Sequence, residues 1–318
     1  MIADRALPPS PAAGVMEDLA ALASQLRSSP DVPTDAGPLA EWLYGGWYLN
    51  LRAPDVLQGP PIAEEIDIVA ALEAAHAASV RFEDGWLADR VSTTGRVEGI
   101  NGNRRRVLGP GQYVVVDRGG ASAEPGDRLR VPGSLASVEH GFWVARTWSF
   151  VEHPEADLTR VYVNARLRGC GAAVALLTGA LEEARTPYGL KVNLQLRQAQ
   201  RADAVVLYLP RDRFGSVRQQ LAGVAAGLSA AGHLVPATPR LTAWLHGGIA
   251  AADGLAGGES FGQERCAIIA SALVGVSGER ATADAIATRS FTAMREAGLD
   301  PSRPWLAAGT DHDYAPLA

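Results

Sequence analysis

Residues 158–210 constrain the fold most, because their pattern changes from strand to helix and back to strand. Residues 159–164 read as a strand, residues 169–184 as a helix opened by glycine, and residues 189–194 and 203–209 as two further apolar runs. Strand-like runs separated by one helical segment are typical of a sheet with a crossover helix. We therefore predict that this segment forms the centre of a sheet.

Lys191 lies in the middle of the second predicted strand and is the only lysine of the chain, whereas the other basic residues are arginines. Arginine keeps its proton in proteins, but burial can shift lysine toward the neutral form that acts as a base or nucleophile. An unpaired charge among apolar residues is costly, so Lys191 is the first catalytic candidate. The alternative is a lysine without a chemical role, with its stem along the strand and its ammonium in water.

Composition excludes several classes of protein. The 318 residues are 47% hydrophobic, no run of 18 apolar residues occurs, and no basic start precedes an apolar core. A membrane span and a secretory signal are therefore not expected. Two cysteines are too few for a disulfide framework or a cysteine metal site, which favours the cytoplasm. A net charge of −6 argues against nucleic-acid binding. We expect no cofactor and no metal.

Pattern changes along the chain predict an α+β protein in three parts. Residues 1–79 form a helical N-terminal segment, residues 80–155 a small antiparallel β-rich middle, and residues 156–318 an α/β C-terminal domain with the site. The middle region contains short β-like runs broken by glycine and proline. These runs are Trp86–Val91, Arg104–Leu108, Gln112–Val116, Arg128–Val131 and Phe142–Trp148.

A helix start near residue 260 is a candidate anion site. Ser260 is a predicted N-cap, with Gln263 at the capping-box position. The unpaired amides of a helix start favour an anion, and we expect Arg265 to project toward the same place. The alternative is an ordinary capped helix after a flexible turn.

Arginines and histidines near the central strands supply further candidates. Arg160 lies one residue into the first predicted strand and Arg201 lies between the second and the third, and an arginine fork binds phosphate with two hydrogen bonds. His246, His140 and His153 are possible general acids, although each is individually more typical of a structural residue. No histidine spacing of a metal site occurs in the sequence.

Several motifs together resemble the HopA-type effector family. More narrowly, they resemble its bacterial biosynthetic branch, whose members accompany an aminoglycoside-phosphotransferase-like kinase in making class V lanthipeptides and thioamitides. The motifs are Arg160-x-Tyr162-x-Asn164, Leu190-Lys191, residues 201–208 (RADAVVLY), residues 258–266 (GESFGQERC) and Arg303-Pro304-Trp305-Leu306. The resemblance is strongest in the C-terminal half, and the Gly-Glu-Ser-Phe-Gly block is its most specific part.

The resemblance implies a lyase that works with the kinase as a heterodimer. The kinase phosphorylates Ser or Thr of a precursor peptide, and the lyase removes the phosphate to leave dehydroalanine or dehydrobutyrine. This chemistry needs a base for the Cα proton and cations for the departing phosphate. The expected catalytic residues are Lys191 and His246. The expected phosphate- and substrate-binding residues are Arg160, Tyr162, Asn164, Arg201, Glu259, Ser260 and Arg265.

Two other functions remain open from the sequence. A non-catalytic partner would bind the leader peptide and the kinase through the aromatic N-terminal face around Trp47 and Tyr48. An effector-like protein-interaction module is the weaker alternative.

Overall fold

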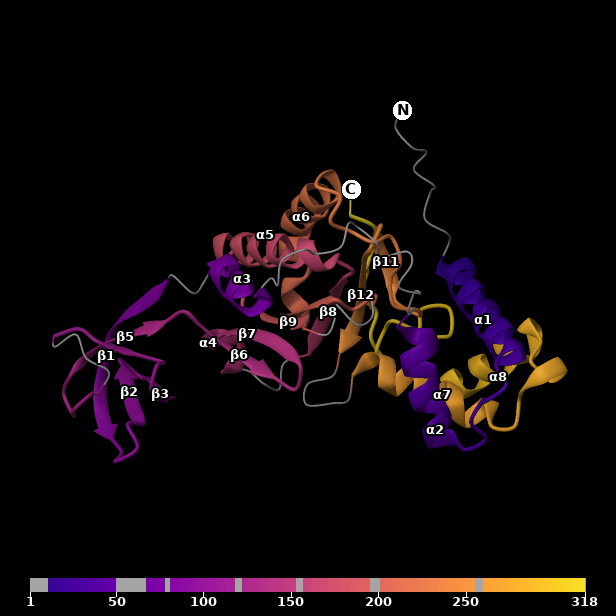
Figure 1. Cartoon of the computed structure of the whole chain (residues 1–318), viewed down its shortest axis with the longest axis horizontal. Helices are drawn as coiled ribbons and strands as arrows, with labels where there is room; N and C mark the ends of the chain where they lie inside the picture. The colour runs from indigo at the N-terminus through magenta and orange to yellow at the C-terminus, as the bar shows by residue number, and fades with distance from the viewer. Residues whose placement is uncertain are drawn as a thin grey trace.

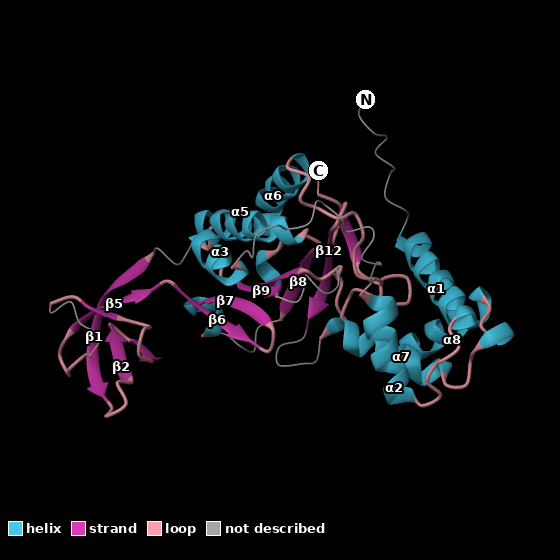
Figure 2. Cartoon of the chain, in the orientation of Figure 1, coloured by secondary structure: helices cyan, strands magenta, loops and turns pink. Residues whose placement is uncertain are grey.

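The computed structural model describes residues 11–49, 67–77, 81–117, 122–152, 157–194, 201–254 and 260–317. Within these residues the chain is a mixed α+β protein with one five-stranded and one seven-stranded sheet (Figures 1 and 2). This confirms the predicted fold class. None of the helices in this part of the chain combines the length and the apolar character that crossing a membrane needs.

Helices from both ends of the chain pack together. Helix α1 (Pro11–Ser28) contacts α8 (Ala283–Glu296), and α2 (Ala36–Trp42) contacts α7 (Phe261–Leu273). The π-helical turn η1 (Leu43–Tyr48) continues α2. Trp47 and Tyr48 are only 1% and 2% exposed, and the Trp47 indole donates to the Asp18 carbonyl at 3.0 Å. The aromatic face of this segment is therefore part of the core.

The smaller sheet stands to one side of the molecule in Figure 1 and has its own core. Its strand order is β3-β2-β1-β5-β4, and the pairs are antiparallel. Trp86 and Leu129 are among the buried residues between its strands. The strands are β1 (Phe82–Val91), β2 (Val97–Asn101), β3 (Arg104–Leu108), β4 (Val114–Val115) and β5 (Arg128–Pro132).

A buried arginine joins the smaller sheet to the rest of the molecule. The Arg106 guanidinium lies between the rings of Trp86 and Trp148, 4.5 and 4.6 Å from their centroids. It also pairs with Glu83 and with Glu152, at 2.9 and 2.8 Å. Trp148 belongs to the short helix α4 (Trp148–Val151), outside the smaller sheet. Charge and stacking therefore hold this joint together.

The larger sheet has the order β11-β12-β8-β10-β9-β7-β6, with every pair antiparallel. Its first two strands in sequence fall within the region that the sequence assigned to the β-rich middle. The strands are β6 (Ser134–Glu139), β7 (Phe142–Thr147), β8 (Leu158–Val163), β9 (Gly189–Asn193), β10 (Val205–Pro210), β11 (Ala243–His246) and β12 (Ile249–Gly254).

A crossover helix connects two strands of this sheet, as predicted. Helix α5 (Cys170–Glu183) links β8 to β9, and β10 lies between them, antiparallel to both. β8 and β9 therefore run in the same direction. Short 3₁₀ turns lie at Leu167–Gly169, Arg211–Arg213, Gly215–Val217 and Gly278–Arg280.

Helices α3 (Ile68–Ala75), α5 and α6 (Arg218–Ala230) lie along one face of this sheet, and α2 and α7 lie on its other side (Figure 1). Side chains alternate between the two faces along a strand. The helix-covered face carries Val161, Leu190 and Leu207, all 0% exposed. We call the opposite face, which carries Arg160 and Lys191, the polar face.

Candidate functional site

Strand register places the predicted catalytic lysine in a row of side chains on the polar face. Lys191 on β9 pairs with Val144 on β7 and Val206 on β10, and Val206 pairs with Tyr162 on β8. The next row on this face consists of Arg146, Gly189, Tyr208 and Arg160. Two rows on four adjacent strands therefore bring Lys191 and Arg160 to one area.

A hollow of about 50 Å³ lies where this area meets η1 and the start of α7. We call it the cationic hollow. It brings together five of the predicted site residues: Arg160, Tyr162, Lys191, Arg201 and Ser260. Its other lining residues are Tyr44, Tyr48, Phe142, Asp203, Val206, Tyr208 and Gly262. A space of a few water-sized groups suits a phosphoryl group better than a large side chain.

Lys191 is half-buried, and burial is the main cause that lowers the pKa of its ammonium. The charges of Arg201 and Arg160 lower the pKa further, while those of Asp203 and Glu139 oppose them. Its Nζ lies 3.7 Å from the centroid of the Phe142 ring. This ring contact favours the ammonium, whereas the lowered pKa makes the neutral amine, the form that acts as a base, more accessible.

The two arginines of the cationic hollow are held differently. Arg160 is 6% exposed, and its guanidinium carbon lies 5.8 Å from the centroid of the Tyr208 ring. A Cβ at Gly254 would come within 2.7 Å of the Arg160 Nε, so glycine there leaves room for this side chain. Arg201 makes two hydrogen bonds to the Asp203 carboxylate, at 2.9 and 3.0 Å. Asp203 therefore fixes its orientation and offsets its charge.

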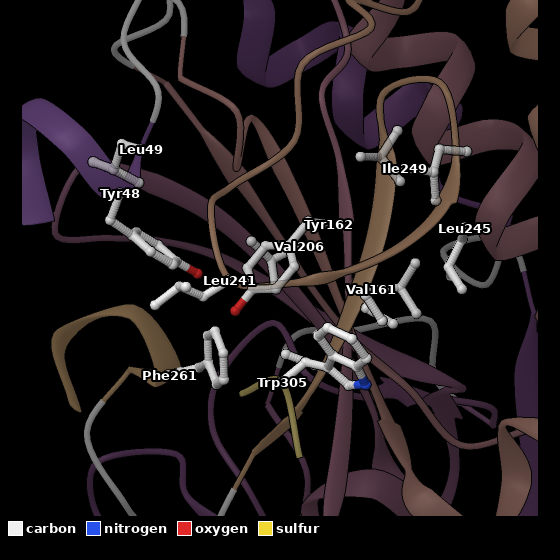
Figure 3. Close-up of a cluster of buried hydrophobic side chains, with 14 of the residues drawn as sticks. Tyr48, Leu49, Val161, Tyr162, Val206, Leu241, Leu245, Ile249, Phe261 and Trp305 are labelled. Carbon is white, nitrogen blue, oxygen red and sulfur yellow. The ribbon is translucent and has the colours of Figure 1, made fainter. Parts of the chain in front are cut away.

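Tyrosines from two distant segments line the same hollow. Tyr44 and Tyr48 of η1 stack with ring centroids 5.5 Å apart, and the Tyr48 and Tyr162 hydroxyls point toward each other (Figure 3). Burial raises the pKa of Tyr44, Tyr48, Tyr162 and Tyr208, so the four phenols stay protonated and can donate hydrogen bonds.

Gly262 allows η1 to approach α7. A Cβ at this position would come within 2.2 Å of the Tyr48 ring. The glycine in the Gly-Glu-Ser-Phe-Gly block therefore has a packing role, and any larger residue would push Tyr48 out of the hollow. In Figure 3 the Phe261 ring lies below the Tyr48 ring, and their centroids are 6.2 Å apart.

The predicted capping box at the start of α7 is confirmed. The Ser260 hydroxyl accepts from the Gln263 amide at 3.2 Å, and the Gln263 side chain accepts from the Ser260 amide at 3.3 Å. Glu259 lies outside the described residues. Ser260 thus serves both as a helix cap and as part of the lining of the hollow.

The expectation that Arg265 points toward this helix start is wrong. Its guanidinium donates to the carbonyls of Pro304 and Leu306, each at 2.8 Å, and pairs with Glu264 at 2.9 Å. The side chain is 1% exposed, and α7 turns it toward the C-terminal segment instead of the hollow. Arg265 therefore fastens residues 304–306 to α7.

Two other predicted residues also lie outside the cationic hollow. The Asn164 side chain donates to the Ala237 carbonyl at 2.8 Å and is 2% exposed, which is typical of a structural role. His246 is on the edge strand β11, four strands from β9, or roughly 19 Å at the usual strand spacing. Its Nδ1 lies 3.2 Å from the Gly247 carbonyl oxygen. The structure does not bring His246 to Lys191.

A second hollow of about 310 Å³ adjoins the first and shares Phe142, Lys191 and Tyr208 with it. We call it the apolar hollow. The other lining residues are Glu139, His140, Val144, Arg146, Phe150, Leu158, Gly189 and Leu190. Arg146 makes two hydrogen bonds to Glu139 and is the main cause that lowers the pKa of Glu139 to about 2. This pair is ionised at neutral pH and cancels its own charge.

A larger hollow, of about 780 Å³, lies between α1, β11 and the C-terminal segment. Glu17, Asp18, Asp311 and Asp313 are among its lining residues, whereas Arg303 is its only arginine. None of the predicted site residues that the structure describes lines it. Its acidic character makes it a poor place for a phosphate, so the cationic hollow is the better candidate site.

The fold and the site together define an α+β protein with a small anion-sized hollow in which an amine faces two guanidinium groups. The model of the HopA1 effector protein family matches residues 135–306, which is more than half of the chain. The protein therefore belongs to the HopA1 effector protein family.

Two solved structures have a similar fold. One is an effector protein from Pseudomonas syringae pv. tomato strain DC3000, with 14% identity and a TM-score of 0.53, covering 94% of this chain and 99% of that one. The other is an effector protein from Pseudomonas syringae pv. syringae strain 61, with 16% identity and a TM-score of 0.55, covering 93% and 98%. No curated protein sequence matches this chain.

Proposed function

We propose that this protein is a phosphoserine/phosphothreonine lyase subunit. It eliminates phosphate from a precursor peptide that a partner kinase has phosphorylated, leaving dehydroalanine or dehydrobutyrine in lanthipeptide or thioamitide biosynthesis. The observation that carries the proposal is the half-buried Lys191, with its lowered pKa, in one hollow with Arg160 and Arg201. The resemblance of the motifs to the biosynthetic branch of the family supports the same function.

The proposed reaction is a β-elimination. The neutral Lys191 amine takes the Cα proton, the electron pair of that bond forms the Cα–Cβ double bond, and the Cβ–O bond breaks. The phosphate leaves with the electrons of the broken bond. A phosphate ester carries about −1.5 to −2 charges at pH 7, and Arg160 and Arg201 lie where they can bind it. The neutral tyrosine hydroxyls can donate to the remaining oxygens.

The charge balance of the hollow decides whether Lys191 can act as a base. A bound phosphate dianion raises the pKa of a nearby ammonium, whereas burial and neighbouring arginines lower it. Arg160 and Arg201 both act in the lowering direction. The arginines thus have two roles in the proposal, since they bind the leaving group and offset its effect on the base.

The kinase and the precursor peptide are the proposed partners, with the kinase in a heterodimer. Membership of an effector family favours one other candidate, a non-catalytic module that binds protein partners. Such a module would bind the phosphorylated precursor or the kinase without changing the peptide. A measurement of the peptide mass therefore distinguishes the lyase from the binding module.

The test incubates the purified protein with phosphorylated precursor peptide, alone and with the kinase, and follows the peptide mass. The lyase predicts loss of phosphoric acid, and Lys191→Ala should slow this loss by about 100-fold or more, since a positioned base contributes roughly 10²–10⁴-fold. Arg213→Ala, which removes an exposed arginine outside both hollows, is the control and should keep the wild-type rate. Unchanged phosphopeptide in both arms would support the binding module, and full activity of Lys191→Ala would remove the proposed base.

A further inference from the structure

The apolar hollow has no role in the elimination itself, although it opens beside the base. It shares Phe142, Lys191 and Tyr208 with the cationic hollow, so a ligand bound in one extends naturally into the other. Its volume of about 310 Å³ is roughly six times larger and lies at the lower end of the range for ligand sites, about 300–1,000 Å³. The phosphate hollow thus continues into a space large enough for a side chain.

The lining of the apolar hollow favours an uncharged group. Val144, Phe150 and Leu158 supply aliphatic and aromatic surface, and Arg146 and Glu139 neutralise each other at 2.8 and 2.9 Å. An acidic or basic ligand group would lose hydration there without gaining an unpaired partner from this ion pair. The other ionisable residues of the lining are His140 and Lys191, and Lys191 is engaged as the proposed base. Burial of apolar surface is the favourable contribution that remains.

A glycine on the polar face shapes this hollow. Gly189 lies in the row between Arg146 and Tyr208, where any other residue would place a side chain on the polar face. A Cβ at Gly189 would lie only 2.8 Å from Cε1 of Phe150. The missing side chain therefore lets the Phe150 ring lie against β9, where it forms part of the wall.

We propose that the apolar hollow binds an apolar side chain of the precursor peptide, close in sequence to the phosphorylated residue. This proposal rests on the proposed function, because it takes the phosphorylated residue to lie in the cationic hollow. In an extended peptide, side chains on the same side recur every second residue, roughly 7 Å apart. The residue two positions before or after the phosphorylated one is thus the natural occupant, and the hollow selects which Ser or Thr is dehydrated.

Measuring the affinity for precursor peptides tests this proposal without requiring phosphate release. The probes are precursor peptides with a phosphonate analogue of phosphoserine, in which CH₂ replaces the bridging oxygen so that phosphate cannot leave. Leu, Ala, Asp or Trp is placed at each position from two residues before to two residues after the analogue. We expect Leu at one of these positions to lower Kd about tenfold relative to Ala, as burial of one leucine predicts, and Asp to raise Kd.

Variants of the lining test whether the preference for Leu over Ala arises in the apolar hollow. Val144→Phe fills it, and the preference for Leu over Ala should then fall within about twofold. Val138→Phe is the matched control, because it makes the same change at an exposed position of the same sheet outside the hollow. Phe150→Ala is a second variant that enlarges the hollow and should shift the preference from Leu toward Trp. Thermal unfolding verifies that each variant is folded.

Equal Kd values for Leu and Ala peptides at every position would overturn the proposal, as would an unchanged preference in folded Val144→Phe and Phe150→Ala. Phosphate release from ordinary phosphopeptides is measured separately. A protein that shows the preference but releases no phosphate supports the apolar hollow and overturns the lyase function. A protein that releases phosphate but shows no preference overturns only the role of the hollow.

Discussion

The two faces of the larger sheet are built from the same strands and yet differ in almost every physical property. On the helix-covered face, Val161, Leu190 and Leu207 are 0% exposed and surrounded by apolar neighbours. One residue away along the same strands, Arg160 and Lys191 line the cationic hollow together with phenols and the Asp203 carboxylate, and Lys191 also lines the apolar hollow. The comparison shows how the fold separates stability from chemistry, since strand alternation assigns neighbouring residues to different tasks.

The prediction with the largest expected effect tests whether the helix-covered face contributes more to stability than the polar face. Leu207→Ala leaves a cavity on the helix-covered face and should lower the free energy of unfolding by about 2–5 kcal/mol. Lys191→Ala, on the adjoining strand but on the polar face, should change it by less than about 1 kcal/mol. Urea denaturation of both variants measures the difference. Equal losses would show that the polar face is part of the structural core.

The second prediction concerns the lowered pKa of Lys191 on the polar face. Because Lys191 is the only lysine in the sequence, reductive ¹³C-methylation labels this side chain and the N-terminal amine, and NMR can follow its titration. We expect a midpoint below the ordinary value of about 10.4, a higher midpoint in Arg201→Gln, and a lower one in Asp203→Asn. An unshifted midpoint in the wild type would contradict the role of burial.

The lowered pKa of Lys191 predicts how both the rate of the proposed elimination and the stability of the fold change with pH. The proposed elimination should accelerate as pH rises through the pKa of Lys191, because only the neutral amine accepts a proton. The unfolded chain holds its lysine proton up to about pH 10.4, whereas the folded protein releases it at lower pH. Between these two pKa values the unfolded state binds more protons, so the contribution of Lys191 to stability rises with pH.

The smallest expected effect is at His246, which the sequence suggested as a catalytic residue. It lies four strands from Lys191, at the edge of the sheet, so His246→Ala should change the rate of phosphate release by less than about twofold. A single-turnover comparison with the wild type measures this. A tenfold loss would mean that the site extends to β11 and that the comparison of the two faces must include the sheet edge.

Much of the fold was predictable from the sequence where local patterns are strong. The β3 strand was predicted with its observed bounds, Arg104–Leu108, and the crossover helix follows from the alternation of patterns in residues 158–210. The β2 strand (Val97–Asn101) was missed because Gly99, which the pattern treats as a break between strands, lies inside it. A turn with Gly248 at φ +82° separates β11 from β12, a break that the apolar pattern of these residues does not show.

The site was predictable only for residues whose chemistry is visible locally. Lys191 stood out by its uniqueness, and the Ser260 cap by its spacing. Tyr44 and Asp203 were missed as lining residues because their positions depend on how η1 and the segment before β10 dock onto the sheet. The direction of Arg265 was wrong for the same reason, since packing against residues 304–306 decides it.

The position of β10 bears on the order in which a newly made chain assembles the candidate site. Residues 205–210 follow both β8 and β9 in sequence but insert between them. Until that insertion, the two earlier strands have no shared partner that would bring Arg160 near Lys191. A chain that ends before residue 205 consequently lacks the strand that sets Arg160 beside Lys191, and the lining of the cationic hollow is complete only once Ser260 and Gly262 at the start of α7 have followed.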